Sequence, residues 1–511
     1  MKNKLIIALL GILFFSQACD DSILDKTNPN QLTVDQYYTN ADELTAATNA
    51  IYGQFTGSDL WGRMMQYFSD TRADEHSTGG PQLETRNAQL LTGTYDNSNY
   101  TIIAAYRGLY RLIHRANAVI EFGPNIEDID SDLRAHRIAE AKFLRAWAYY
   151  YLTVNWGRVP IYTETVKSPD GYQPLAEESE IFNLLETDLT DIQSVLKVTH
   201  SSEDRGRATK GAAQLLLARV LMHQGKYSEA RTVLLDIYEN GPYRLMDNYS
   251  DNFREETSYN DESIFEIGFT GTGFNWWEDG NGDGPNDKQN VMFQDYSPVA
   301  WRNMIPSDKL INAFEHPENG DDKEDPRLRE SVIFVGDMFG PPENPIELTA
   351  ERVGGYTSNF HGEDVLLGWF KYSPMYKIDP GEYYTSSINY RNMRFAEVLI
   401  KLAECENELD NIPEALGYLN EIRSRPSVDM PDYPTARFPS NTKVEVRRTI
   451  MHESLVEFSN EKLRPLELAR WRRNGHFDET NPDPVAYIRN NPARALLPLP
   501  DTEVSRNNLI N

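Results

Sequence analysis

Two carboxylates in one polar segment are the first residues in the chain that could do chemistry. Asp70 and Asp74 lie four residues apart, and glycoside hydrolysis needs a pair of carboxylates beside the scissile bond. No further motif selects this pair, and a hydrogen-bonding polar loop accounts for it better. The sequence also lacks GxSxG, HExxH and phosphate-loop motifs. We therefore predict a binding protein with no catalytic residues, and keep a surface glycosidase as the weakest alternative.

A second acidic segment resembles the first half of a calcium-binding loop. It offers oxygen ligands at Asp279, Asn281 and Asp283, with Gly284 at the sharp turn. The twelfth position is Asn290, which cannot supply the bidentate carboxylate of such a loop. The segment predicts either a structural calcium site or an acidic turn, and no other cofactor is expected.

Aromatic residues supply the apolar surfaces that carbohydrate recognition needs. A sugar ring has an apolar C–H face and a rim of hydroxyl groups, so it binds flat rings flanked by planar polar groups. Trp276 and Trp277 stand side by side in a polar stretch, where burying both rings is difficult. Further candidates from the same part of the chain are Tyr296, Trp301, Trp369 and Tyr372.

The charge of the chain excludes polyanionic partners. The formal net charge is −28, from 50 basic and 78 acidic residues. A protein that reads nucleic acid needs a basic face, whereas this chain would repel phosphate. Nucleic acid is therefore not an expected partner.

The first residues predict export and a lipid anchor. Lys2 and Lys4 precede an apolar run over residues 5–15, which is too short to span a bilayer and is typical of a secretory signal. Cys19 follows the small residue Ala18, and the segment resembles a bacterial lipoprotein signal in which Cys19 is acylated. Acidic residues directly after that cysteine resemble the signal for the outer face of the outer membrane. Cys405 is then the only remaining cysteine, so no intramolecular disulfide is expected.

Helical periodicity dominates the first half of the chain and returns near the C-terminus. Residues 136–160 give the longest pattern, with Ala141, Leu144 and Leu152 on one face, Arg145 on the other, and Gly157 at the end. Further amphipathic helices are predicted over residues 42–55, 106–121, 180–196 and 444–473, the last with a break at Pro465.

Two helix pairs have the spacing of tetratricopeptide repeats. In residues 208–240 small and apolar residues recur at the repeat's positions, and Gly225 marks the turn. Residues 395–425 repeat the scheme more loosely, with Asp410 at the turn. Because such pairs bury their faces against neighbours, the earlier helices are expected to complete the stack.

The interval between these pairs is irregular. Residues 243–387 are rich in Gly, Pro, Trp and Tyr, and only residues 263–269 and 332–335 have strand character. So long an irregular stretch inside a compact protein is typical of a functional region.

Five blocks together resemble the SusD/RagB family of surface lipoproteins. They are RANAVI from Arg115, AEAKFLRAWAYYYLTVNWGRVP from Ala139, GPYRL with ESIFEIGF from Gly241 and Glu262, YRNMRFAEVLIKLAEC from Tyr390, and HESLVEFSNEKLRPLELARWRRNG from His452. The resemblance covers nearly the whole mature chain and concerns scaffold residues.

The resemblance implies a mainly α fold, in which a tetratricopeptide-like scaffold carries a large irregular ligand-binding region. Residues 1–18 would be the signal peptide, 19–38 the lipidated tether, and 39–511 one domain. That domain would divide into helical repeats (39–242), the irregular region (243–387) and C-terminal helices (388–511).

The implied function is capture of an oligosaccharide at the cell surface and its delivery to a SusC-type TonB-dependent transporter, on which the protein acts as a lid. Family ligand surfaces include the loop after the first helices, which adds the candidates Trp61, Asp70, Arg72 and Asp74. A peptide cargo, as in RagB-like members, is the main alternative.

Overall fold

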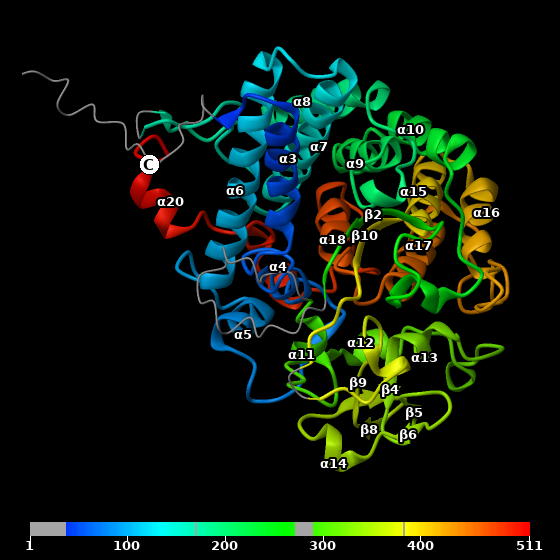
Figure 1. The fold of residues 1–511 in the computed structure, drawn as a ribbon. Helices are drawn as coiled ribbons and strands as arrows, with labels where there is room; N and C mark the ends of the chain where they lie inside the picture. Colours follow the sequence, from blue (N-terminus) through cyan, green and yellow to red (C-terminus); the bar gives the residue numbers. More distant parts are fainter. Residues whose placement is uncertain (1–36, 169–170, 271–289, 382–383, 511) are drawn as a thin grey trace, which may run out of the picture.

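The computed structural model describes residues 37–168, 171–270, 290–381 and 384–510. The described chain is mainly helical (Figure 1). One group of helices packs beside another, and a region of short strands and short helices lies against both (Figure 1). Among the described residues, no helix combines the length and apolar character needed to span a bilayer.

The first group of helices forms a bundle around one buried helix. Its members are α3 (Ala41–Phe55), α6 (Tyr100–Phe122), α7 (Ser131–Trp156) and α8 (Glu178–Asp191). Asp130 caps the start of α7 by accepting a hydrogen bond from the Leu133 amide, and Gly157, at φ +71°, ends the helix as predicted.

Helix α7 is buried more completely than its sequence indicates. Every residue from 143 to 156 is buried, so the helix has no exposed face over this stretch. The expected outer position Arg145 is buried as well, because its guanidinium pairs with Asp188 of α8 at 2.7 Å. The Arg145 charge, on the side of the helix opposite the predicted apolar face, is therefore neutralised inside the protein. The helical periodicity did not reveal this pairing.

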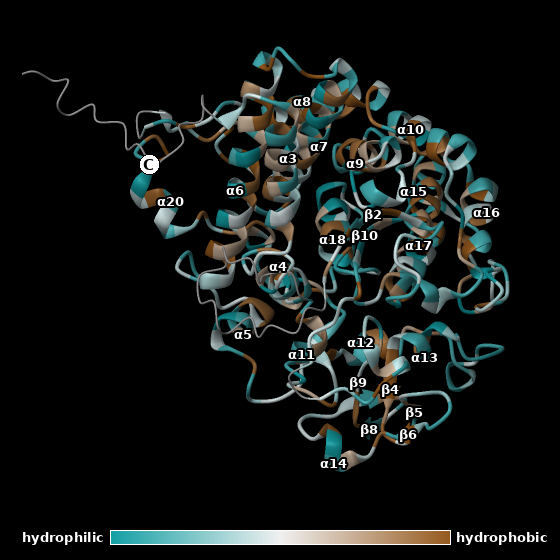
Figure 2. Ribbon diagram, in the orientation of Figure 1, coloured by the Kyte–Doolittle hydropathy of each residue, from teal (hydrophilic) through white to brown (hydrophobic). Residues whose placement is uncertain are grey.

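The predicted helix pairs form the second group. They are α9 (Lys210–His223) with α10 (Tyr227–Asn240), and α15 (Phe395–Glu408) with α16 (Ile412–Arg423). Gly225 and Asp410 both have positive φ in the turns between the paired helices, at +74° and +66°. Hydrophobic and hydrophilic residues are interspersed along these helices in Figure 2. Helices α10 and α16 bury one side. Helices α9 and α15 are buried almost throughout.

Two helices near the C-terminus close the stack. Helix α17 (Lys443–Glu457) packs on α15 and α16, and α18 (Arg464–Arg473) follows after a short turn. The predicted break at Pro465 is displaced, since Pro465 lies in the first turn of α18 and the chain leaves helical geometry before Arg464. A proline fits this position because the first helical amides need no intrahelical acceptor. The remaining C-terminal helices are α19 (Ala486–Asn490) and α20 (Asp501–Arg506).

Within the described residues, the strands form five separate antiparallel pairs. They are β1 (His76–Thr78) with β3 (Met304–Pro306), β2 (Ser263–Ile267) with β10 (Tyr390–Arg394), β4 (Val332–Phe334) with β9 (Leu367–Trp369), β5 (Met338–Phe339) with β6 (Ile346–Glu347), and β7 (Ser358–Phe360) with β8 (Glu363–Val365). Strands β2 and β4 fall within the two stretches of predicted strand character. The short helices of this region and its surroundings are α4 (Met64–Asp70), α5 (Thr85–Thr92), α11 (Met292–Tyr296), α12 (Asp308–Ile311), α13 (Arg327–Ser331) and α14 (Ala350–Val353).

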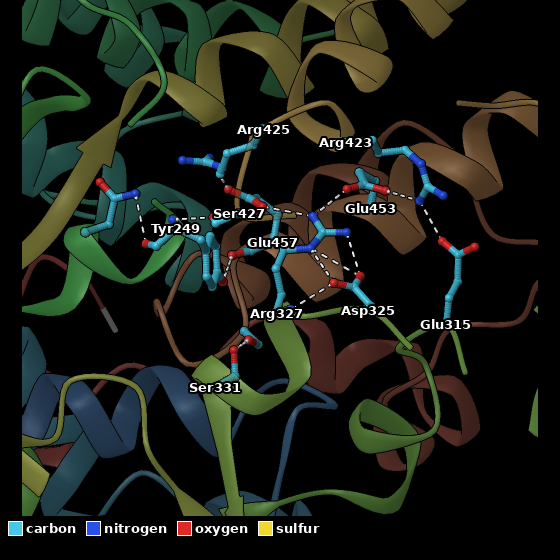
Figure 3. Close-up of polar contacts among 12 residues, drawn as sticks. Tyr249, Glu315, Asp325, Arg327, Ser331, Arg423, Arg425, Ser427, Glu453 and Glu457 are labelled. Carbon is cyan, nitrogen blue, oxygen red and sulfur yellow. Dashed lines mark hydrogen bonds and ion pairs between the residues drawn. The ribbon is translucent and has the colours of Figure 1, made fainter. Parts of the chain in front are cut away.

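A buried network of charges joins the irregular region to the helical repeats (Figure 3). Glu457, at the end of α17, forms ion pairs with Arg394 at 2.7 Å, Arg425 at 3.0 Å and Arg327 at 2.9 Å. Arg327 begins α13 in the irregular region, whereas Arg425 follows α16. Glu453, one turn before Glu457, also binds Arg327. One carboxylate therefore holds together three segments that are distant in the sequence.

Candidate functional site

Six of the residues proposed from the sequence lie outside the described residues. They are the proposed lipidation site Cys19, the aromatic candidates Trp276 and Trp277, and the three candidate calcium ligands Asp279, Asn281 and Asp283. The roles proposed for them remain predictions.

Four of the proposed aromatic platforms are buried. Trp61 is 1% exposed and stacks on Tyr390, with 4.3 Å between ring centres. Trp369 is 2% exposed and packs 4.7 Å from the His76 ring. Tyr296 and Tyr372 are buried too. Their rings fill the core of the fold, so the expectation that they offer exposed stacking surfaces was wrong for this structure.

The polar segment that follows Trp61 is also internal, although a solvated loop was expected. Asp70 ends α4 and lies 2.9 Å from the Lys462 Nζ, and it accepts a hydrogen bond from the Tyr296 hydroxyl at 2.7 Å. The buried Arg72 donates to the Ala495 carbonyl at 3.0 Å. Lys462 therefore neutralises Asp70 inside the protein, whereas Arg72 is held by a backbone carbonyl.

Asp74 faces a different set of partners from Asp70. It binds the Arg464 guanidinium at 2.8 Å and Lys309 at 2.5 Å. Burial opposes the charge, but the Arg464 and Lys309 cations hold the pKa of Asp74 below its ordinary value. With each carboxylate committed to its own cations, the two do not form an exposed acid–base pair.

An exposed ring surrounded by planar charged groups lies at the start of α6. Tyr100 is the first residue of this helix and is 44% exposed. Asn99 caps the helix by accepting a hydrogen bond from the Thr101 amide, and its own amide donates to the Arg86 carbonyl at 2.9 Å. The capping residue thus fixes Tyr100 beside α5.

Two guanidinium groups flank this ring. The guanidinium carbon of Arg86 lies 5.1 Å from the ring centre and that of Arg107 lies 5.7 Å from it. Arg107 makes a two-point contact with Asp59, at 2.8 and 2.6 Å. Arg86 binds Glu84 at 2.6 Å. We call Tyr100, Arg86, Arg107, Asp59 and Glu84 the Tyr100 platform.

The platform is anchored to the irregular region. Glu84 also accepts a hydrogen bond from Arg63 at 3.1 Å, and the buried Arg63 binds Asp295 of α11 through two further bonds of 3.0 and 3.2 Å. The sequence candidate Trp301, which is half-buried, follows six residues after Asp295. Ordered charges of this kind hold the side chains around Tyr100 in place before a ligand arrives.

The arrangement suits an uncharged ligand that has an apolar face and a hydroxyl rim. The part of the Tyr100 ring that Arg86 and Arg107 leave exposed offers the apolar face. The guanidinium and carboxylate groups offer donors and acceptors in fixed planes. Tyr100 was not predicted from the sequence, because it stands apart from the aromatic clusters of the irregular region. The signal was a tyrosine after an Asn cap, with Arg86 and Arg107 nearby in the sequence.

Comparison with known proteins gives consistent results along the chain. Residues 261–511 match the family described as "SusD family", and residues 20–222 match "Starch-binding associating with outer membrane". SusD-like protein P25 of Formosa agariphila is 23% identical over 490 residues, covering 92% of this chain and 90% of that protein. A SusD-like protein of Bacteroides ovatus is 28% identical over 294 residues, covering 54% and 52% of the two chains.

Solved structures share the fold. A SusD superfamily protein from Bacteroides vulgatus superposes with a TM-score of 0.75 at 22% identity, over 93% of this chain and 99% of that chain. A SusD-like carbohydrate binding protein from Bacteroides fragilis gives 0.75 at 20% identity, over 93% and 100%. A laminarin binding SusD-like protein gives 0.71 at 21% identity, over 92% and 98%.

Proposed function

Because the chain belongs to the SusD family, whose members are non-catalytic binding proteins, we propose that it captures a glycan at the outer membrane and that the Tyr100 platform contacts this glycan. The observation that supports this proposal most directly is the exposed Tyr100 ring between Arg86 and Arg107. Fold relatives described as carbohydrate binding and laminarin binding support the ligand class.

The chemistry of the platform favours a glycan over the alternative cargo, a peptide. Extended peptides are recognised mainly through backbone hydrogen bonds along an edge or groove. An exposed ring with planar donors instead fits a sugar ring and its hydroxyl groups. The affinity is expected to be modest and little affected by salt, because the ligand carries no charge. Trp276, Trp277 and Trp301 remain predicted contacts.

Replacing Tyr100 by alanine is expected to lower the affinity for the captured glycan by about tenfold, the usual cost of removing a central aromatic contact. The fold should be unaffected, because the ring is largely outside the core. Isothermal titration calorimetry of the two proteins measures the change. Tyr356→Ala is the matched control, since Tyr356 is 50% exposed and is not part of the platform. An equal loss of glycan affinity in both variants, or no loss of affinity in Tyr100→Ala, would exclude the Tyr100 platform as the glycan contact.

We further propose that the captured glycan passes to a SusC-type TonB-dependent transporter, on which this protein acts as a lid. Family resemblance supports this partner. A lid must stay near its barrel, and a lipid anchor on Cys19 provides such a tether.

Replacing Cys19 by serine is therefore expected to release the protein from the membrane fraction. Serine cannot form the thioether that carries the acyl chains, so the hydrophobic attachment is lost. Cell fractionation followed by immunoblotting measures the distribution, and Cys405→Ser is the control because Cys405 is buried in the fold. If the Cys19 variant stays in the outer membrane as the wild type does, the anchor lies elsewhere.

A further inference from the structure

Two histidines from separate loops meet on the surface of the irregular region. His316 precedes the short 3-10 helix at Pro317–Asn319, and His361 lies in the turn between β7 and β8. Their ring centres are 4.6 Å apart. One donor atom from each imidazole and one carboxylate oxygen of Glu318 lie within 4.8 Å of one another.

We propose that His316, His361 and Glu318 bind a divalent transition-metal ion such as Zn²⁺. Two imidazoles and a carboxylate are the ligand types that zinc takes in proteins, and a fourth position can be filled by water. Calcium and magnesium prefer all-oxygen ligand sets, so the two histidines select against them.

Two further carboxylates lie beside the site. The Nε2 of His316 lies 3.5 Å from a Glu324 oxygen, and the His316 amide donates to Asp321 at 2.9 Å. Because Glu324 also pairs with Arg329 and Asp321 with Arg437, most of the charge available to a cation between the rings comes from Glu318. Glu324 is thereby placed as a positioning residue, or as a further ligand after a side-chain rotation.

The donor atoms need only a small movement to reach metal-binding geometry. Ligand nitrogens about 2 Å from a tetrahedral zinc ion are separated by about 3.4 Å, compared with the present limit of 4.8 Å. His316 is partly exposed and Glu318 is exposed, so their side chains have room to close. His316 Nδ1 now accepts a hydrogen bond from the Glu318 amide at 3.2 Å. If the metal binds Nε2, the proton moves to Nδ1 and this contact is given up.

The backbone at His361 fixes one side of the site. His361 has φ +50°, in the left-handed region that few residues other than glycine and asparagine adopt. Its amide donates to the Asn312 side chain at 3.0 Å, which holds the turn between β7 and β8 against the segment that leads to His316. A bound metal ion would cross-link these two loops.

Asparagine is the substitution of choice at both positions. At His361 it tolerates the left-handed backbone. At His316 it can still accept the hydrogen bond from the Glu318 amide, as asparagine does at helix starts. The double variant His316→Asn/His361→Asn therefore removes both imidazoles while keeping the local backbone interactions.

Calorimetric titration of the purified, EDTA-treated protein with ZnCl₂ tests the site. We expect one equivalent of zinc to bind the wild type, and the double variant to bind at least about tenfold more weakly. Glu318→Gln, a change at an exposed position, should also weaken zinc binding. It provides a second test if the double variant proves unstable. His114→Asn, which removes a histidine of α6, should leave zinc binding unchanged.

Two results would overturn the proposal. One is an absence of saturable zinc binding to the wild type. The other is an unchanged zinc affinity and stoichiometry in both the double variant and Glu318→Gln. Titration with CaCl₂ should give no signal that depends on these residues. Glycan binding by the Tyr100 platform is measured separately and can fail or succeed independently.

Discussion

Replacing Glu457 by alanine is expected to lower the free energy of unfolding by about 3–5 kcal/mol, the usual cost of breaking a buried ion pair. The substitution removes the carboxylate that pairs with Arg394, Arg425 and Arg327 together. Arg394 and Arg425 then still share Glu262, while Arg327 keeps Asp325 and Glu453. Because these arginines come from different segments, the variant should loosen the contact between the irregular region and the repeats. Denaturant unfolding followed by circular dichroism measures the change.

The same carboxylate gives the protein a definite acid sensitivity. Burial opposes its charge, but the neighbouring Arg394, Arg425 and Arg327 hold the pKa of Glu457 well below its ordinary value. The stabilisation is complete above the pKa of the unfolded state and is lost as the pH falls through the folded-state pKa. The exposed Glu239 on α10 provides the control. Glu239→Ala should change stability by less than about 0.5 kcal/mol, and an equally small effect of Glu457→Ala would contradict the central place given to the network.

Replacing Glu75 by glutamine is expected to stabilise the protein at alkaline pH and to have little effect in acid. Glu75 is 1% exposed, and neither carboxyl oxygen has a hydrogen-bond partner among the described residues. Burial raises the pKa of Glu75 to about 8, from an ordinary value of 4.5. Between these values the folded protein keeps a proton that the unfolded chain releases, so stability declines as the pH rises.

Glutamine has nearly the same shape and never ionises, so it removes this pH-dependent loss. Each pKa unit corresponds to about 1.4 kcal/mol, and the gain above pH 8 should therefore lie between about 2 and 5 kcal/mol. The measurement is the denaturation midpoint of wild type and variant across the pH range, with Glu239→Gln as the control. If the difference in denaturation midpoint between Glu75→Gln and wild type is the same at pH 4.5 and at pH 8, Glu75 is ionised in the folded state and the prediction is wrong.

The helices could be predicted because their information is local. The paired helices α9/α10 and α15/α16 are predicted by residue spacing and turn signals. In the structure Thr209 caps the start of α9, and Gly225 and Asp410 lie in the turns between the paired helices. The helix break predicted at Pro465 was misplaced, because a proline can begin a helix as well as break one.

The interior charges could not be predicted, because polarity does not reveal a distant partner. Asp74 pairs with Arg464, 390 residues further along, and Arg63 pairs with Asp295, 232 residues away. Each side chain looks solvated until the fold brings its partner to it. For the same reason the buried rings of Trp61 and Trp369 looked like platforms, whereas Tyr100, which the packing of α5 and α6 leaves exposed, did not stand out.

The most direct test of the proposed function is a binding screen of the purified protein against plant, microbial and host polysaccharides, by affinity gel electrophoresis and then calorimetry. We expect the protein to bind at least one glycan, with little effect of salt on the affinity, and we expect Tyr100→Ala to bind that glycan more weakly than Tyr356→Ala does. Binding of peptides instead, with no glycan retained on any gel, would contradict the proposed function.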